Sequence, residues 1–229
     1  MLKDLLSLLF SEGCYTCGKS LTQQETCVCF DCLEQFIETG FEKTPQKNDL
    51  FFRFAGKVPI DGTISAYYFD KQGFLQKLLH ELKYKDRPEI GVFLGKLLAL
   101  KLQKHDFLTG IEVLVPVPLH PQKERQRGYN QAAEICKGVS EVTGLAIDLE
   151  YLRRNKYTET QTRKSLQERW ENVADAFEVR DTAYQGVLLI DDVITTGATL
   201  ESCIKALITK DLAPKTIKIA SVALARGRD

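Results

Sequence analysis

No run of apolar residues in this chain of 229 residues approaches the roughly 18 residues that a membrane-spanning helix needs. Excess charge is absent too, because 31 basic and 31 acidic side chains give a formal net charge of zero. This balance excludes a histone-like or wholly basic nucleic-acid coat but allows local basic patches. The first ten residues resemble a signal sequence only weakly, since Asp4 interrupts a short apolar stretch and no small-residue cleavage site follows. We therefore expect an amphipathic packing helix there, in a cytoplasmic protein without membrane insertion.

Charge is distributed unevenly along the chain. Residues 71–130 carry 11 basic and 6 acidic side chains, a net charge of +5, and residues 150–170 carry 6 and 3, a net charge of +3. These two stretches are candidate binding regions for anionic ligands, and the alternative is that they form solvated helix faces.

Short apolar runs alternate with helical patterns over most of the chain, which favours an α/β domain with a parallel sheet covered by helices on both faces. Ligands of such domains bind at the carboxyl ends of the strands. The length allows one domain and a small annex, which we place at residues 50–229 and 1–40, joined by an aperiodic segment from Glu38 to Gly56. We expect strands near 62–70, 111–117, 187–190 and 217–225, and helices near 74–82, 92–102, 131–142 and 198–209.

Five of the seven cysteines lie close together near the N-terminus. Cys14 and Cys17 form one C-x-x-C pair, and Cys29 and Cys32 form a second. Four thiolates at this spacing can bind one Zn²⁺ tetrahedrally, and a site with four protein ligands is structural rather than catalytic. Cys27 could replace Cys29, but only Cys29 gives the second pair its two-residue spacing, so we favour Cys29.

The most informative segment is Val187 to Thr199, which reads VLLIDDVITTGAT. Four apolar residues predict a buried strand, and Asp191 and Asp192 stand at its carboxyl end. A loop of small and hydroxylated residues then leads into a helix, and the backbone N–H groups of such a loop form an anion site with the helix N-terminus. Two carboxylates beside a phosphate suit the hydroxyl groups of a ribose, because carboxylates accept their hydrogen bonds.

This segment is neither a P-loop nor a dinucleotide fingerprint, because it has no Gly-Lys-Ser/Thr and lacks the required glycines. It closely resembles the signature of the type I phosphoribosyltransferases, which bind phosphoribosyl pyrophosphate. The resemblance implies that Asp191 and Asp192 hold the ribose 2- and 3-hydroxyls. It also implies a loop that holds the 5-phosphate, made of Thr195, Thr196, Gly197, Ala198 and Thr199.

A four-cysteine ribbon ahead of such a domain resembles the ComF/ComFC family of bacterial competence proteins. Three further segments fit this family: Leu82 to Lys85, Pro116 to His120 with Arg125 to Gln131, and Thr160 to Thr162 with Leu166 to Asn172. Members are associated with natural transformation, the import of single-stranded DNA. The resemblance therefore implies single-stranded DNA and other transformation proteins as partners.

The resemblance also assigns the basic segments. Pyrophosphate needs arginine or lysine, which the loop after Val115 supplies as Lys123, Arg125 and Arg127. Residues 153–169 resemble the catalytic loop of the type I enzymes, residues 50–110 are the candidate base-selecting hood, and Mg²⁺ is expected with the pyrophosphate. The candidate contacts of the catalytic loop are Gln161, Arg163 and Lys164. Candidate nucleic-acid contacts at a basic helix end, with a stacking ring, are Lys83, Tyr84 and Lys85.

Overall fold

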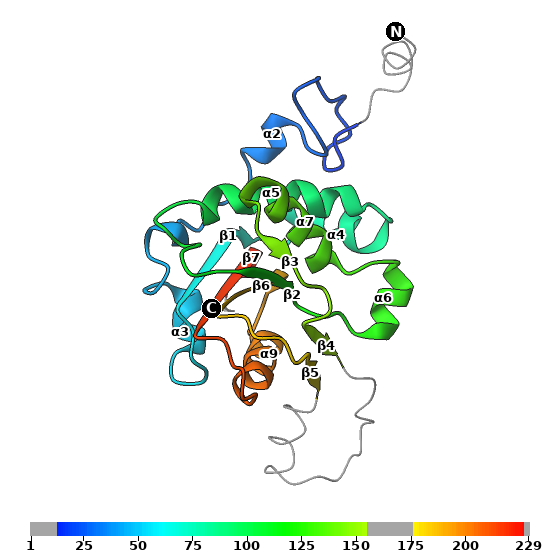
Figure 1. Cartoon of the computed structure of the whole chain (residues 1–229). Coiled ribbons are helices and arrows are strands. Elements are labelled where there is room, and N and C mark those ends of the chain that lie inside the picture. The colour runs from blue at the N-terminus through cyan, green and yellow to red at the C-terminus, as the bar shows by residue number, and fades with distance from the viewer. Residues whose placement is uncertain (1–12, 155–175, 227–229) are drawn as a thin grey trace, which may run out of the picture.

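The computed structural model describes residues 13–154 and 176–226. Its centre is a five-stranded sheet with the order β1-β7-β6-β2-β3, in which every neighbouring pair is parallel (Figure 1). The strands are β1 (Gly62–Phe69), β2 (Val113–Pro116), β3 (Ala146–Ile147), β6 (Gly186–Ile194) and β7 (Thr216–Ala225). The expected parallel α/β architecture is confirmed.

Helices cover both faces of this sheet (Figure 1). The side chains of β6 alternate between two apolar cores: Leu188 and Ile190 pack on the side of α4, α5 and α7, whereas Val187 and Leu189 pack on the side of α3 and α9. Burial on both faces explains why this strand is a continuous apolar run rather than an alternating one. The helices are α3 (Asp49–Phe54), α4 (Phe74–Tyr84), α5 (Pro88–Leu102), α7 (Gln131–Thr143) and α9 (Ala198–Ile208).

Two glycines allow α5 and α7 to pack backbone to backbone. A Cβ atom on Gly95 would lie 2.1 Å from the Ile135 carbonyl oxygen, and one on Gly138 would lie 2.0 Å from the Val92 carbonyl oxygen. No side chain fits at such distances, so these positions need glycine. The close approach fixes α5 against α7.

The N-terminal module contains the short helix α2 (Phe30–Leu33) and two isolated bridges, Gly13 with Ser20 and Thr26 with Val28. It lies at one end of the molecule, above α5 in Figure 1. The Tyr15 hydroxyl donates a hydrogen bond of 2.8 Å to Glu89 at the start of α5. The module therefore contacts the helical layer, and residues 37–39 at its end pair with the edge strand β1 of the sheet.

Two short strands, β4 (Leu152–Arg154) and β5 (Phe177–Val179), pair antiparallel outside the main sheet. They flank residues 155–175, which lie outside the described part of the chain. The expected N-terminal helix and the candidate loop contacts Gln161, Arg163 and Lys164 fall outside it as well.

Most of the expected elements are found within a few residues of their predicted bounds, but the segment after β2 is different. Residues Pro121–Arg127, which we took for a loop, form the helix α6. Pro121 at the first helical position and Gly128 just after the end, with a φ of 82°, explain this helix. The 3-10 helix η1 (Phe41–Lys43) and α3 lie in or beside the connecting segment, which is therefore not irregular.

Residues 50–110, the candidate hood, contribute β1 at the edge of the sheet together with α4 and α5 of one covering layer. Their assignment as a base-selecting hood stays a prediction. Among the described helices, none has the length and apolar character that crossing a bilayer demands.

Candidate functional site

The candidate site lies where β6 continues beyond its neighbour β2. The ladder between them ends at Pro116 opposite Ile190. On the other side, β7 continues to pair with β6 as far as Ile194. Asp191 and Asp192 are therefore inside the carboxyl-terminal part of the strand, which continues past the predicted apolar run to Ile194, and they face no β2 partner. This opening at a strand end is where parallel sheets bind their ligands.

The two aspartates occupy an environment that disfavours two full charges. Both side chains are half-buried. Burial, and then the nearby negative charge of Asp192, raise the pKa of Asp191 from its ordinary 3.8 to about 8. Hydrogen bonds along the backbone orient the pair, because the Asp192 N–H donates to Asp191 Oδ1 at 2.8 Å and the Val193 N–H donates to Asp192 Oδ1 at 2.7 Å.

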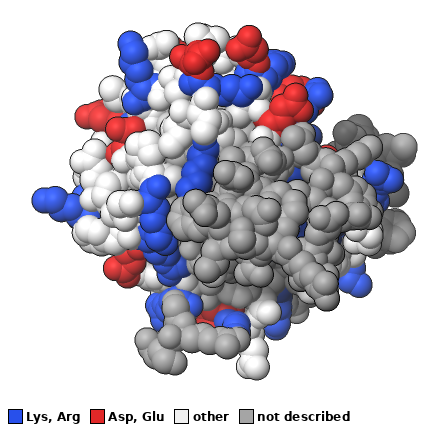
Figure 2. Space-filling view, turned by 90° about the horizontal axis from the view of Figure 1, so that it is seen from below, with Lys and Arg blue, Asp and Glu red and all other residues white. Residues whose placement is uncertain are grey.

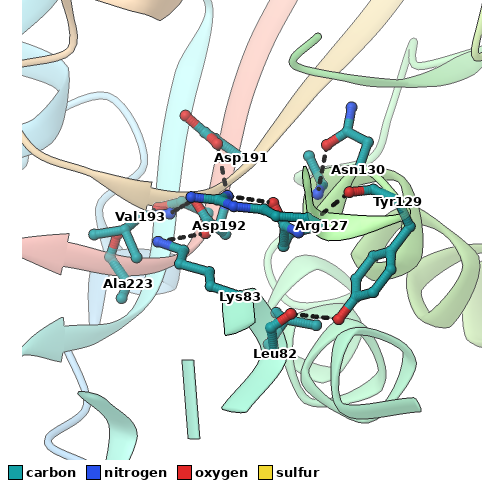
Figure 3. A network of polar contacts seen from close by, with 12 residues as sticks. Leu82, Lys83, Arg127, Tyr129, Asn130, Asp191, Asp192, Val193 and Ala223 are labelled. Atoms are coloured by element: carbon teal, nitrogen blue, oxygen red, sulfur yellow. Dashed lines mark hydrogen bonds and ion pairs between the residues drawn. The ribbon is translucent and has the colours of Figure 1, made fainter. Parts of the chain in front are cut away.

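A lysine from another element compensates the charge of Asp192. Lys83, in the last turn of α4, places its Nζ atom 2.7 Å from Asp192 Oδ2 (Figure 3). Sequence reasoning placed Lys83 with Tyr84 and Lys85 in a nucleic-acid surface. The structure separates them: Lys83 turns into the acidic site, while Tyr84 and Lys85 are exposed.

The loop from Thr195 to Gly197 connects β6 to α9, so it brings the helix N-terminus next to the aspartates. The side chains of Thr195, Thr196, Ala198 and Thr199 are exposed, whereas Gly197 is buried. Gly197 has a φ of 84°, and a Cβ atom there would lie 2.8 Å from the Phe54 ring. The loop is thus seated on α3, and its hydroxyl groups and helix N-terminus remain accessible to an anion.

Arg53 of α3 stabilises the same loop, and sequence reasoning missed it. Its guanidinium group donates hydrogen bonds to the carbonyl oxygens of Thr195 and, at 3.0 Å, Ala225. It therefore joins the phosphate-type loop to the end of β7. Its residue type gave no specific signal, because a single arginine in a short amphipathic helix is usually a surface residue.

The three candidate pyrophosphate contacts differ in their surroundings. Arg125 is exposed on α6, whereas Arg127 is half-buried at its end. Arg127 donates a 2.6 Å hydrogen bond to Gln131, and its guanidinium carbon lies 5.5 Å from the centre of the Tyr84 ring. In Figure 3 its side chain extends toward the aspartate pair. Lys123 is exposed on the same helix.

Tyr129 connects the segment after α6 to the end of α4 and to the start of α5. Its hydroxyl donates to the Leu82 carbonyl oxygen and accepts a hydrogen bond of 3.2 Å from the Arg87 N–H. It follows α6 directly and contacts the residue next to Lys83 (Figure 3). Asn130 then caps α7, since its Oδ1 atom accepts from the Ala132 N–H at 3.0 Å.

The cysteine module brings together the four thiols of the two C-x-x-C pairs. The sulfur atoms of Cys14, Cys17, Cys29 and Cys32 all lie within 4.8 Å of one another, a set that could hold a metal ion. Burial raises the pKa of Cys14, but hydrogen bonds from backbone N–H groups outweigh it and lower the value to about 6, which favours the thiolate. Cys27 is outside this set; its Sγ atom lies 3.9 Å from the Glu89 carbonyl oxygen.

Residues 13–20, GCYTCGKS, also match the letters of the P-loop motif, but they do not form one. Gly13 and Ser20 bridge antiparallel, and the Cys14 N–H donates to the Lys19 carbonyl oxygen at 2.8 Å. The segment is one knuckle of the cysteine module and does not connect a strand to a helix.

Comparisons with known proteins agree with this geometry. The model of the phosphoribosyl transferase domain family matches residues 127–229, which include β6, the loop and α9. The "DNA utilization protein YhgH" of Escherichia coli is 34% identical over 131 residues, covering 55% of this chain and 57% of that protein. The chain thus spans little more than half the length of this relative.

Two relatives carry competence names. "Competence protein F" of Haemophilus influenzae is 29% identical over 199 residues, which cover 85% of this chain and 77% of that protein. "Competence protein ComFC" of Bacillus subtilis is 32% identical over 120 residues, which cover 50% of this chain and 45% of that protein.

Proposed function

This chain belongs to the ComF/ComFC family, and we propose that it binds phosphoribosyl pyrophosphate at the carboxyl end of β6 and transfers the phosphoribosyl group to a nitrogen nucleophile. One observation carries the proposal: β6 carries Asp191 and Asp192 in its carboxyl-terminal half, and a threonine-rich loop that opens α9 follows its end directly. The aspartates are suited to the ribose 2- and 3-hydroxyls. The loop of residues 195–199 is suited to the 5-phosphate.

The arrangement supports this assignment because it offers acceptors to the hydroxyl groups of the ligand and donors to its phosphate. Carboxylates accept hydrogen bonds from hydroxyl groups, whereas a phosphate needs N–H and O–H donors. Thr195, Thr196 and Thr199 offer such donors on the exposed side of the loop, and the positive end of α9 adds to their effect. The arginine and lysine side chains of α6 would then bind the pyrophosphate.

In the proposed reaction the bond between the sugar carbon and the pyrophosphate oxygen breaks, while a bond from the nitrogen nucleophile forms. Mg²⁺ would accompany the substrate and offset the charge of the departing pyrophosphate. The protein would contribute by positioning both reactants and by stabilising positive charge at the sugar, for which the carboxylate pair is well placed.

We propose Zn²⁺ for the cysteine module. Four sulfur ligands without an open position fit a structural zinc ion, and the cytoplasm, our proposed location, keeps such thiols reduced. The module would then stabilise the N-terminal region and offer a surface to other proteins of DNA uptake.

A second candidate function is a catalytically silent module that binds phosphoribosyl pyrophosphate and single-stranded DNA. It is favoured by Tyr84, which is 63% exposed and lies beside His80, with ring centres 4.8 Å apart, and beside Arg127. An exposed ring beside an arginine suits base stacking next to a phosphate backbone. Figure 2 shows many Lys and Arg side chains on the face seen from below, with Asp and Glu mostly near its edges.

Two measurements test these proposals. Calorimetric titration with phosphoribosyl pyrophosphate and Mg²⁺ should show binding that Asp192→Asn weakens and the exposed control Asp211→Asn does not. Pyrophosphate release with a panel of bases should then show turnover. Binding without turnover would replace the enzyme by the silent module, and absence of binding by the wild-type protein would reject both.

The DNA proposal needs a separate measurement. Tyr84→Ala and Lys85→Ala should weaken binding of a single-stranded oligonucleotide, whereas Lys104→Ala, at an exposed lysine beyond the end of α5, should not. Equal affinity of all variants for the oligonucleotide would show that Tyr84 and Lys85 do not bind it.

A further inference from the structure

The ion pair between Lys83 and Asp192 is the most specific polar contact of the site. The Lys83 side chain is 22% exposed and that of Asp192 is 14% exposed, so the pair is largely shielded from water. Its Nζ–Oδ2 distance is 2.7 Å. The other oxygen of Asp192 accepts from the Val193 N–H. Both carboxylate oxygens are therefore contacted by the protein; Oδ2 is closed to solvent, and Oδ1 retains a lone pair for a second donor.

The position of Lys83 is fixed by the residues before and after it. Leu82 is fully buried in the core, and its carbonyl oxygen accepts a hydrogen bond from the Tyr129 hydroxyl. Lys83 also stands in the last turn of α4, where the helix dipole favours a positive charge. The neighbouring Tyr84 and Lys85 point to solvent. The lysine thus reaches Asp192 from a helix end that cannot shift without breaking buried contacts.

Asp192 needs such a partner because of its surroundings. Its neighbour Asp191 is a second acid, and the proposed ligand carries phosphate groups on both sides of its ribose. Without a cation, Asp192 would be free to rotate away, and it would then present no fixed acceptor to a hydroxyl group. A charge-assisted bond at a defined oxygen prevents this rotation.

We propose that Lys83 is a positioning residue of the ribose site: it holds the Asp192 side chain in one orientation, so that the carboxylate accepts a hydrogen bond from a hydroxyl of the phosphorylated sugar. This inference rests on the proposed function and extends it. It gives α4, a helix outside the β6–α9 segment, a role in recognising the sugar. Recognition of the phosphate stays with the loop between β6 and α9.

The test compares two ligands by calorimetry, ribose 5-phosphate and inorganic phosphate, since only the first carries sugar hydroxyls. In the wild-type protein ribose 5-phosphate should bind more tightly. Lys83→Met should reduce this preference about tenfold or more, the loss of one charge-assisted bond. Lys83→Arg should retain most of the preference, because arginine supplies a cation at the same place. Lys104→Met, at an exposed lysine outside the site, should behave like the wild-type protein.

The outcomes separate the two proposals. If the wild-type protein does not prefer ribose 5-phosphate, the proposed function fails and the role of Lys83 fails with it. If the wild-type protein does prefer it and folded Lys83→Met keeps the preference, or loses both affinities equally, the positioning role alone is overturned. Should Lys83→Met not fold, Lys83→Gln provides the same comparison, because glutamine keeps a donor without the charge.

Discussion

Replacement of Asp191 by asparagine should stabilise the protein in a manner that depends on pH. The ordinary pKa of 3.8 applies in the unfolded chain, whereas the half-buried site raises the pKa to about 8. Between these values the folded protein keeps a proton that the unfolded chain has lost. The free energy of unfolding of the wild-type protein therefore falls as pH rises between these two values. The full destabilisation is present above about pH 8.

The size of the effect follows from the shift. At about 1.4 kcal/mol per unit, a rise from 3.8 to about 8 gives an upper limit of about 6 kcal/mol. Lys83 and partial solvent access reduce this limit, and we expect about 1–3 kcal/mol at about pH 8. Asparagine keeps the oxygen that accepts the Asp192 N–H, so the substitution removes the charge with little loss of hydrogen bonding.

Urea unfolding at several values between about pH 5 and pH 8 measures the effect. The free energy of unfolding of Asp191→Asn relative to the wild-type protein should increase steadily with pH, while exposed Asp211→Asn should give a constant difference. A difference for Asp191→Asn that stays constant or decreases with rising pH would show that the site does not hold this carboxyl in its neutral form.

Three other predictions concern the module and the loop. Cys29→Ser should lose bound zinc, measured by metal content after gel filtration, whereas Cys27→Ser should retain it; the reverse result would exchange the two ligands. Gly197→Ala should lower the melting temperature and the free energy of unfolding by about 2 kcal/mol or more, since it combines a positive φ with a clash against an aromatic ring, and an unchanged melting temperature would contradict the loop geometry. Arg53→Ala should weaken binding of inorganic phosphate about tenfold by releasing the loop, while exposed Lys57→Ala leaves it unchanged; equal affinities would remove Arg53 from the site.

The helices and strands that depend on a local pattern of apolar residues could be predicted from the sequence. The apolar run at 187–190 identified β6, and helical spacing identified α4, α5, α7 and α9, because burial imposes these periods directly on the chain. The VLLIDDVITTGAT segment likewise located the acids and the loop together, since they are neighbours along the chain. The two C-x-x-C pairs selected the four thiols for the same reason.

Contacts between distant segments could not be predicted in this way. Arg53 and Thr195 are 142 residues apart, and only the packing of α3 on the sheet brings them together. Lys83 looked like one of several surface cations, because its charge is visible in the sequence but its direction is not. The glycines Gly95 and Gly138 carried no sign of their role until α5 and α7 were seen to touch through their backbones.

The junction between α4 and α5 connects the cysteine module to the candidate site. Arg87 stacks over the Tyr15 ring of the cysteine module, with 4.3 Å between the guanidinium carbon and the ring centre, and its N–H bonds Tyr129. Tyr129 in turn supports the helix end that carries Lys83. The cysteine module and the acidic site are thus linked through Arg87 and Tyr129. Destabilising the cysteine module would therefore weaken the support of Lys83, even though the module contributes no atom to the acidic pair.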